Sequence, residues 1–313
     1  MDFHKLKPHL PWITLLALLA IVGIPNPDFL RPTNLLELAG DIVPLFIMAL
    51  GLTFAVYIGG IDLSAQSIAN MVTVIASVYL ASMGPWVAVV CVACGFLLGM
   101  VSGYATTKLF VPSFISTLAV GGLAFSVAQW LSGQRALNMN AAQRDNVFGW
   151  MIGHVGIIPN ELLLAAGLLL ICLFIERRTR LGRVFKAIGA GEPAAAASGV
   201  DVGFYKILAF AISGALAAIA GLLFAVKLSG GAPTIANGFL LPAIVAVLVG
   251  GTPLTGGVGG VLNTAIGAMI VAVIRSSMLY FGIEATQQQM VFGLVLIGAI
   301  ALTIDRSKLK TVK

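Results

Sequence analysis

Charged side chains are scarce in this sequence, and their scarcity argues against a soluble fold. Asp, Glu, Lys and Arg together make up 10% of the 313 residues, whereas a soluble domain has about 25%. Apolar residues make up 59%, and the mean hydropathy is +1.03. Because no soluble interior could bury so much apolar surface, we expect the solvent to be lipid. The long apolar runs do not alternate, which favours transmembrane helices over a barrel.

Residues that could carry out chemistry are also few. The three histidines are His4, His9 and His154, and no acidic residue falls in the middle of a predicted span. No lysine directly follows a glycine, which excludes the Gly-Lys pair of a phosphate-binding P-loop. We therefore predict that the chain is not an enzyme, that it needs no cofactor or metal, and that it does not hydrolyse ATP.

Apolar runs separated by proline and glycine predict an all-α membrane protein of about ten transmembrane helices in one domain, 1–313. The window 239–250 is the exception, because about twelve residues reach only about 18 Å, against a hydrocarbon core of about 30 Å. This window either crosses the membrane or re-enters it. The predicted spans are 10–24, 42–58, 66–83, 86–107, 113–132, 160–176, 205–227, 239–250, 258–280 and 289–304.

The basic residues predict the orientation of these spans. Most of them follow an even number of spans or flank the chain ends, so one topology places them all in the cytoplasm, as the positive-inside rule requires. Both termini are then cytoplasmic, and the segment 133–158 is external. These basic residues are Lys5, Lys7, Lys108, Arg177, Arg178, Arg180, Arg183, Lys186, Lys206, Arg306, Lys308, Lys310 and Lys313.

Two glycine-rich junctions resemble each other and indicate a possible internal repeat, a common construction in transporters. Chance similarity between glycine-rich turns is the alternative, and the relative orientation of the repeats stays open. The residues concerned are Gly59, Gly60, Asp62 and Ser64 at the first junction, and Gly250 and Gly251 at the second.

Asp62 has two interpretations. Asp62 or Ser64 caps the helix that follows, by accepting hydrogen bonds from its first N–H groups. Alternatively, Asp62 belongs to a coupling-ion site. Small residues also recur at helical spacing, which favours close helix packing in lipid. They are Gly95, Gly99 and Gly103 in one span and Gly214, Ala218 and Gly221 in another.

The polar loop 177–204 contains a predicted short cytoplasmic helix. Glu192 and Pro193 begin an alanine-rich stretch that ends at Gly199, with proline early and glycine after the end, as in many helices. A polar loop of this length with its own helix is unusual for a passive connection. An amphipathic surface anchor is the alternative interpretation.

Four segments resemble the ribose and branched-chain amino acid superfamily of ABC importer permeases, closest to its ribose, galactose and autoinducer sugar branch. They are 59–64, 112–119, 179–200 and 246–257, in this order along nearly the whole chain. The resemblance implies a permease subunit that moves a sugar or sugar-like solute across the bacterial inner membrane by alternating access. It also implies three partners: a cytoplasmic ABC ATPase, a periplasmic sugar-binding protein and a second permease subunit, identical or different.

The resemblance assigns the ATPase-coupling role to the helix near 190–200. The coupling residues are Gly189, Glu192, Pro193, Ala195, Ala196, Ser198 and Gly199. One departure is that the family's acidic pair ahead of the late glycine-rich element is replaced here by Leu240, Leu241 and Pro242. The role of those acids is therefore in doubt in this chain.

A sugar path needs mildly polar and aromatic side chains that bind weakly enough to release the solute. The candidates are Thr53, Tyr57, Gln66, Asn70, Phe125, Gln129 and Trp130. The alternative interpretation of each polar candidate is that its side chain forms a hydrogen bond with a neighbouring helix. Two other functions stay open: an ion-coupled carrier that works without an ATPase, and a membrane scaffold that transports nothing.

Overall fold

The computed structural model describes residues 10–280 and 282–303, and its regular structure is predominantly helical. The first half contains α2 (Leu10–Gly23), the 3₁₀ helix η2 (Pro27–Leu30), α3 (Pro32–Asp41), α4 (Val43–Tyr57), α5 (Ala65–Met83), α6 (Trp86–Lys108), α7 (Ser113–Ser132) and α8 (Ala141–Ile152). The second half contains α9 (Asn160–Arg178), α10 (Arg180–Ala190), α11 (Glu192–Ala197), α12 (Val202–Lys227), α13 (Leu240–Val249), α14 (Val261–Tyr280) and α15 (Ala285–Thr303).

Strands are short and lie in the connections. β1 (Leu137–Asn138) pairs antiparallel with β4 (Gly230–Gly231), and β2 (His154–Val155) pairs antiparallel with β3 (Ile158–Pro159). Neither strand pair was anticipated from the sequence. β1, α8 and β2 make up much of the segment 133–158, which was predicted only as external.

Every predicted span contains a helix, with ends that agree within a few residues wherever they can be compared. Residue 304 and the terminal basic residues lie outside the described part. Of the described helices, α5, α6, α7, α12 and Val261–Met278 of α14 are long and apolar enough to cross a membrane, which makes five. The pair α3 and α4, bent by 53°, makes six if it is counted as one span. The helices α2 and α13 and the stretch Gln287–Ile300 are apolar but shorter.

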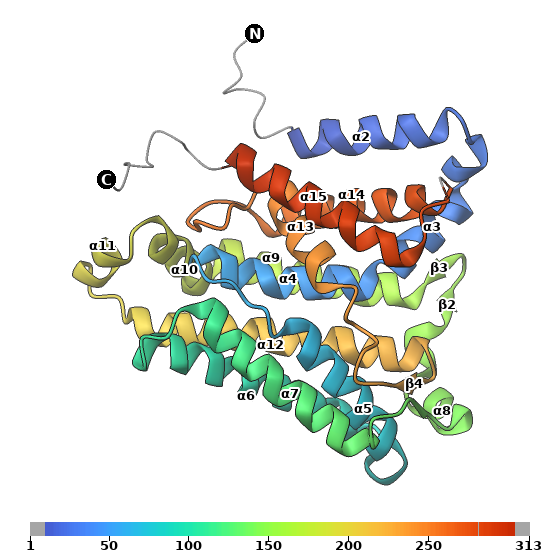
Figure 1. Cartoon of the computed structure of the whole chain (residues 1–313), viewed down its shortest axis with the longest axis horizontal. Helices are drawn as coiled ribbons and strands as arrows, with labels where there is room; N and C mark the ends of the chain where they lie inside the picture. Colours follow the sequence, from blue (N-terminus) through green and yellow to red (C-terminus); the bar gives the residue numbers. More distant parts are fainter. Residues whose placement is uncertain (1–9, 281, 304–313) are drawn as a thin grey trace.

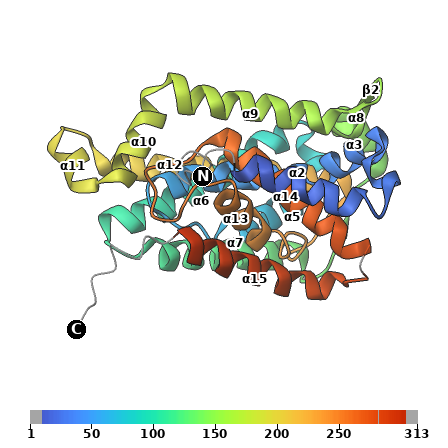
Figure 2. The same cartoon turned by 90° about the horizontal axis from the view of Figure 1, so that it is seen from above.

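The helices lie side by side along the long axis of the molecule (Figures 1 and 2). α10 and α11 lie at one end of this bundle, and α8 with β2 and β3 lies at the other. α2 begins and α15 ends toward the α10–α11 end (Figure 1). The first and last described helices therefore start and finish on the same side as α11.

α4 forms the centre of the core. All of its residues from Val43 to Tyr57 are buried, which is expected for an apolar helix surrounded by other helices. α12 packs against α4, α5 and α6, and α13 and α14 pack against each other and against α4. The centre of the bundle is thus a helix that ends inside it, at Tyr57.

Small residues bring α6 and α12 into close contact, as predicted. A Cβ on Gly95 would collide with the Gly214 carbonyl oxygen, and one on Gly99 would collide with the Phe210 carbonyl oxygen. Gly103 lies in the same way against Ile207. Since lipid supplies no hydrophobic drive between helices, dispersion across such a backbone contact stabilises the pair.

The two glycine-rich junctions end their helices with the same hydrogen bonds. After α4, Gly59 N–H donates to Val56 and Gly60 N–H donates to Ala55; after α13, Gly251 N–H donates to Leu248 and Thr252 N–H donates to Val247. Gly59 and Gly251 both have positive φ, of 73° and 95°, which glycine adopts without strain. The bonding pattern aligns Gly59 with Gly251. Matching the two glycine pairs by sequence, Gly59 with Gly250 and Gly60 with Gly251, is therefore one residue out of register.

Candidate functional site

α11 is a short arm at one end of the bundle. Its residues are exposed except for Ala195, which packs against the core. Pro193 lies in its first turn, where a missing N–H costs nothing. Gly199 follows it with a φ of 78°, and Ser198 donates through Oγ to the Ala194 carbonyl oxygen.

An exposed ion pair joins α11 to α12. Lys206 pairs with Glu192, whose side chain is half exposed. Pairs of this kind contribute about 0–1 kcal/mol. Ala196, predicted as a coupling residue, is exposed beside this pair. The arm therefore presents small side chains and one acid to whatever lies beyond this end of the bundle.

Gly189 brings α10 against the end of α4 and against the glycine-rich segment that precedes α14. A Cβ at this position would collide with the Tyr57 carbonyl oxygen and with the Gly257 amide nitrogen. These two groups bond each other, since Gly257 N–H donates to Tyr57 O at 3.0 Å. Only glycine allows α10 to approach so closely, and this contact is backbone against backbone.

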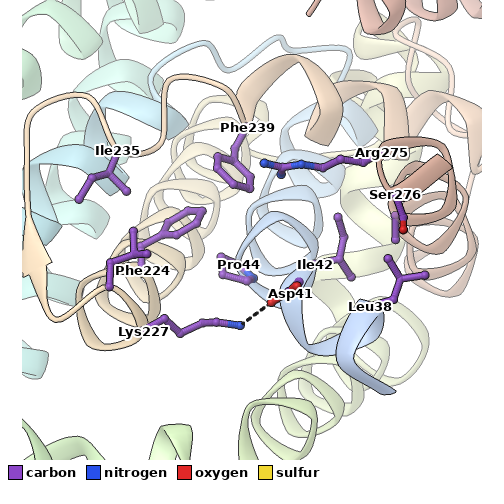
Figure 3. Close-up of a pocket in the computed structure, with 12 residues that line it drawn as sticks. Leu38, Asp41, Ile42, Pro44, Phe224, Lys227, Ile235, Phe239, Arg275 and Ser276 are labelled. Carbon is purple, nitrogen blue, oxygen red and sulfur yellow. Dashed lines mark hydrogen bonds and ion pairs between the residues drawn. The ribbon is translucent and has the colours of Figure 1, made fainter. Parts of the chain in front are cut away.

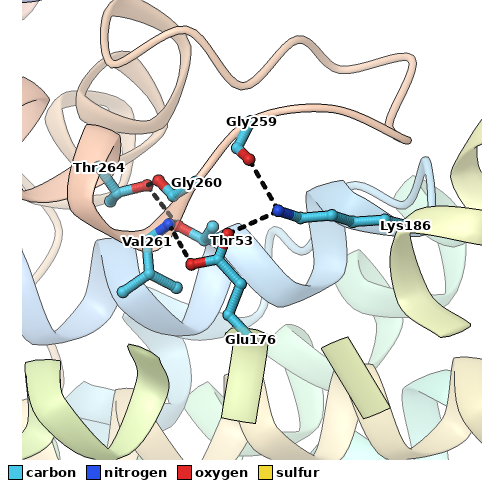
Figure 4. A network of polar contacts seen from close by, with 7 residues as sticks. All are labelled: Thr53, Glu176, Lys186, Gly259, Gly260, Val261 and Thr264. Carbon is cyan, nitrogen blue, oxygen red and sulfur yellow. Dashed lines mark hydrogen bonds and ion pairs between the residues drawn. The ribbon is translucent and has the colours of Figure 1, made fainter. Parts of the chain in front are cut away.

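Lys186, one turn before Gly189, links three elements (Figure 4). Its Nζ donates to Glu176 Oε1 of α9 at 2.6 Å and to the Gly259 carbonyl oxygen at 3.0 Å. The same Nζ lies 5.0 Å from the centroid of the Tyr57 ring, at the end of α4. A cation so placed is attracted to the ring face as well as to the carboxylate.

Glu176 uses its second oxygen to hold the start of α14. Val261 N–H donates to Glu176 Oε2 at 3.0 Å, so the carboxylate bonds one of the free N–H groups at that helix start. The side chain of Glu176 is 6% exposed, and that of Lys186 is 31% exposed. Nearby, Thr53 of α4 and Thr264 of α14 bond through their hydroxyls at 2.7 Å.

The segments that carried the family resemblance contact one another. Ile61 N–H donates to Ser113 Oγ, and Leu63 N–H donates to Thr117 Oγ1, which fixes the loop 59–64 to the start of α7. The coupling segment meets the late glycine-rich element through Gly189. We call the group formed by Tyr57, Glu176, Lys186, Gly189 and 256–261 the linkage cluster.

Asp62 is buried and bonded both to the opening of α5 and to α12. Its Oδ1 accepts hydrogen bonds from Ser64 N–H at 2.9 Å and from Ser64 Oγ at 2.6 Å, and its Oδ2 accepts one from Ser213 Oγ at 2.6 Å. Ser64 is the residue before the first turn of α5 and makes no side-chain cap. The Ser64 form of the capping interpretation was therefore wrong. Asp62 does accept a hydrogen bond from an N–H group at the opening of α5, and it also bonds across to α12.

Two predicted path residues, Gln66 and Asn70, lie one turn apart on α5. Gln66 lines a cavity of about 380 Å³ with Asn237, Leu240 and Leu241; we call it the Gln66 cavity. Asn70 is fully buried, donates to Asn237 Oδ1 at 2.7 Å and accepts from Ala236 N–H at 2.6 Å. Asn70 thereby holds the segment that forms one wall of this cavity.

The other predicted path residues lie elsewhere. Thr53 is buried at its bond with Thr264, and Tyr57 is buried beneath Lys186. On α7, Phe125 and Gln129 are half buried, and Trp130 is 80% exposed at the surface of the bundle. The seven residues therefore do not form one continuous surface in the described part of the chain.

Sequence reasoning did not assign the residues that complete these sites. Lys186 was noted only as one of the basic residues, and Glu176, Ser213, Asn237 and Thr264 were not singled out. The pairings join positions as far apart as 151 and 211 residues, so no local pattern indicates them. The one available signal is that α10 is amphipathic. Its buried face contains Gly182, Val184, Phe185 and Ile188.

Comparison with known proteins gives a family. The model of the family described as "Branched-chain amino acid transport system / permease component" matches residues 34–300. The ribose import permease protein RbsC of Escherichia coli (strain K12) is 32% identical over 299 residues, which cover 95% of this chain and 92% of that protein. The D-allose transport system permease protein AlsC of the same strain is 29% identical over 301 residues, covering 92% and 89%. No solved structure matches the chain significantly.

A helical membrane bundle with these matches defines an integral membrane permease, the transport subunit of an ABC importer. The chain belongs to the family of permease components of branched-chain amino acid transport systems, which includes the ribose-type permeases. Within the described residues no three His, Cys, Asp or Glu side chains gather in a way that could hold a metal ion.

Proposed function

We propose that this permease moves a sugar or sugar-like solute across the bacterial inner membrane, driven by a separate ATPase that docks on α11. The partners we propose are a cytoplasmic ABC ATPase, a periplasmic sugar-binding protein and a second permease subunit. The sugar assignment rests on the relatives whose names state ribose and D-allose.

One observation supports the proposal above all: the exposed helix α11 directly follows α10, which forms part of the buried linkage cluster. α11 is the projecting arm, and α10 behind it contacts the end of α4 and the segment just before α14 through Gly189 and Lys186. A push on α11 would therefore be transmitted to the end of α4 and to the start of α14. Packed interfaces of this kind switch between discrete arrangements and do not deform gradually.

The proposed topology has ten crossings and places both termini and α11 in the cytoplasm. It is supported by the position of α2 and α15, which begin and end toward the α11 side (Figure 1). It also agrees with the basic residues of α9 and α10, since Arg177, Arg178, Arg180 and Arg183 lie at this end. Short helices such as α13 contribute crossings only where protein covers their ends.

We propose that the Gln66 cavity belongs to the sugar path. Gln66 and Asn237 offer amide groups, and Leu240 and Leu241 offer an apolar wall. A small number of polar groups in an apolar cavity is typical of a small-molecule site. The absence of fixed charge on this lining suits weak binding, which a path needs for release.

The ion-coupled carrier is the less favoured function. Its one candidate site was Asp62, and that carboxylate accepts three hydrogen bonds from Ser64 and Ser213. A carboxylate bonded in this way has a structural role that needs no ion. The carrier would still be identified by uptake into liposomes that contain this chain alone under an ion gradient.

Reconstitution tests the proposal. The chain is purified from its native membrane, its associated proteins are identified, and the complex is placed in liposomes with ribose or D-allose and their binding protein. We expect ATP hydrolysis and sugar uptake only when the ATPase is present. Uptake by the chain alone, or a stable complex without any ATPase, would contradict the proposal.

A further inference from the structure

A short segment, residues 229–239, connects the end of α12 with the start of α13 (Figure 1). We call it the strap. It begins with β4, on the side of the bundle opposite α11, and residues 233–239 form turns. Both helices joined by the strap lead back toward the arm. α12 follows α11 along the chain, and α13 is followed by the segment 256–261 of the linkage cluster.

Two side chains of α5 hold the strap. Ala232 N–H donates to Thr73 Oγ1 at 3.2 Å. Ala236 N–H donates to Asn70 Oδ1 at 2.6 Å, and Asn70 Nδ2 donates to Asn237 Oδ1 at 2.7 Å. Asn70 and Thr73 are both fully buried. Because they are three residues apart, they lie on the same face of α5 and bond the strap at two successive places.

The start of the strap packs backbone against backbone. A Cβ on Gly231 would collide with the Thr73 carbonyl oxygen, and a Cβ on Gly230 would collide with the Leu137 carbonyl oxygen of β1. Ser229, which precedes them, has a φ of 54°, a left-handed conformation that residues other than glycine rarely adopt. The chain therefore turns sharply where α12 ends, and it then lies directly on α5.

The strap separates two cavities. A cavity of about 380 Å³ is lined by α3, α12 and α14 and lies toward the end of the bundle opposite α11 (Figures 1 and 3). We call it the outer cavity. Ile235 and Phe239 of the strap line this cavity, and Lys227 and Asp41 pair on its wall. Asn237, between the two strap residues, lines the Gln66 cavity instead. The strap therefore lies between the outer cavity and the proposed sugar path.

We propose that the strap is the outer gate of the sugar path, and that Asn70 and Thr73 are the positioning residues that keep it closed. The proposal deepens the proposed function and rests on it, since the path through the Gln66 cavity and the outward orientation of this end come from there. The gate is closed in this structure, because the bonds from α5 to the strap are all formed.

The bonds that hold the strap suit a part that must open. Side-chain hydrogen bonds each contribute little net stability, so a few of them can be broken at moderate cost. A further bond, from Gln289 Nε2 of α15 to the Gly238 carbonyl oxygen, holds the far end of the strap. Since the strap is continuous with α12 and α13, a movement of these helices relative to α5 breaks its contacts with Asn70 and Thr73. Hinged segments at helix ends commonly take up such movements.

Access to the Gln66 cavity from outside the cell tests the proposal. Gln66→Cys is introduced into the full chain without its native cysteines and expressed without partner proteins. A small membrane-impermeant methanethiosulfonate is then added to intact spheroplasts. We expect Gln66→Cys to react much more slowly than Val155→Cys, which is exposed at the outer end and serves as the reference for an accessible position.

Loosening the strap should speed this reaction. Asn70→Ala removes two bonds to the strap and should raise the rate at Gln66→Cys about tenfold. Thr73→Val keeps the shape of the side chain, removes one bond and should raise the rate about fivefold. Thr106→Val is the matched control, because it removes a 2.7 Å bond between α6 and α7, to Ser116, away from the strap. It should leave the rate unchanged, and thermal unfolding shows that each variant is folded.

Three results would overturn the proposal. One is a rate at Gln66→Cys as high as that at Val155→Cys with the strap intact. Another is a folded Thr73→Val variant that reacts no faster than Thr106→Val. The third is failure of Val155→Cys to react in spheroplasts, which would refute the outward orientation and not the bonding of the strap. The measurement contains no ATPase, so failure of ATP-driven uptake would leave these results untouched.

Discussion

At Glu176, one buried carboxylate bonds two groups that belong to different parts of the chain. Oε1 accepts from Lys186 of α10, and Oε2 accepts from Val261 N–H at the start of α14. Removing only the lysine leaves a carboxylate that is 6% exposed without its cation, and an uncompensated buried charge is more costly than a missing pair. The contribution of the ion pair to stability can therefore be distinguished from the cost of an unpaired charge by comparing a single and a double substitution.

Lys186→Met should lower the free energy of unfolding by about 2 kcal/mol, since Glu176 then remains charged and partly unpaired. Adding Glu176→Gln should recover most of that loss, because a neutral amide still accepts from Val261 N–H. Thermal unfolding in detergent measures both variants. A double variant less stable than Lys186→Met would contradict this account of the pair.

Gly189 and Gly191 give a matched pair of substitutions. Gly189→Ala places a methyl group against the backbone of Tyr57 and Gly257, so α10 must move and stability should fall by about 1–3 kcal/mol. Gly191→Ala meets only the Ala194 side chain at 3.8 Å, and its φ of 176° is extended backbone that any residue adopts. We expect a lowered unfolding temperature and impaired coupling in the first variant only. Equal behaviour of the two variants would show that close approach at Gly189 has no effect.

At the scale of single residues, the sequence indicated some members of the candidate site but not others. Gly189 and the residues of α11 follow from the family resemblance, because they lie in one continuous segment. Lys186 and Glu176 do not, because their pairing requires α9, α10 and α14 to meet. Asp62 was assigned a local role as a helix cap, whereas its third hydrogen bond comes from Ser213, 151 residues away.

At the scale of elements, the contact between α6 and α12 depends on residues without side chains. Gly99→Ala would place a methyl group against the Phe210 carbonyl and the Ala211 Cα, and should lower stability by about 1–3 kcal/mol. Gly122→Ala on α7 meets nothing within 4 Å and should leave stability unchanged or raise it by up to about 1 kcal/mol. The unfolding temperatures of the two variants measure whether close packing at Gly99 stabilises the contact between α6 and α12. A stable Gly99→Ala would mean that the helices separate at no cost.

The α11 arm should affect coupling without affecting the fold. Glu192→Lys reverses an exposed charge and removes the pair with Lys206, at a cost of about 0–1 kcal/mol. We expect near-normal thermal unfolding but reduced sugar-stimulated ATP hydrolysis in the reconstituted complex. Asp145→Lys, at the other end, reverses an exposed acid paired with Arg144 and should change neither property. Normal hydrolysis in Glu192→Lys would count against docking on this arm.

Helix ends were predicted well because proline and glycine mark them in the sequence. Pro85, Pro112 and Pro159 each directly precede the helix that they were expected to introduce. The two short strand pairs and the bend between α3 and α4 were missed, since two-residue strands and a 53° bend have no periodicity. The repeat register was one residue out because adjacent glycines are equivalent in sequence, whereas only one of each pair has positive φ.

For the whole molecule, the two ends of the bundle differ in chemistry. One end carries the arm and the linkage cluster, and the other carries a cavity lined by Asp41, Lys227 and Arg275. α12 runs from the first end to the second and contacts α4, α5 and α6 on the way. Movement at the arm can therefore reach the opposite end of the bundle through a continuous packed helix.

Composition and the long apolar runs predicted that the chain is surrounded by lipid and is helical, because it has too few polar residues to cover a soluble protein. The number of crossings could not be obtained in the same way. α4 and α13 end inside the bundle at Tyr57 and Val249. Helices covered by protein can cross the membrane although they are short, so counting only long apolar helices underestimates the number of crossings.

The side of the membrane on which α11 lies tests the central claim most directly. Cys91, Cys94 and Cys172 are replaced by alanine, and single cysteines are placed at the exposed positions Ala196 and Val155. A membrane-impermeant maleimide should then label Ala196→Cys in inside-out vesicles but not in intact spheroplasts, and Val155→Cys should show the reverse. Labelling of Ala196→Cys in intact spheroplasts would contradict a cytoplasmic docking arm.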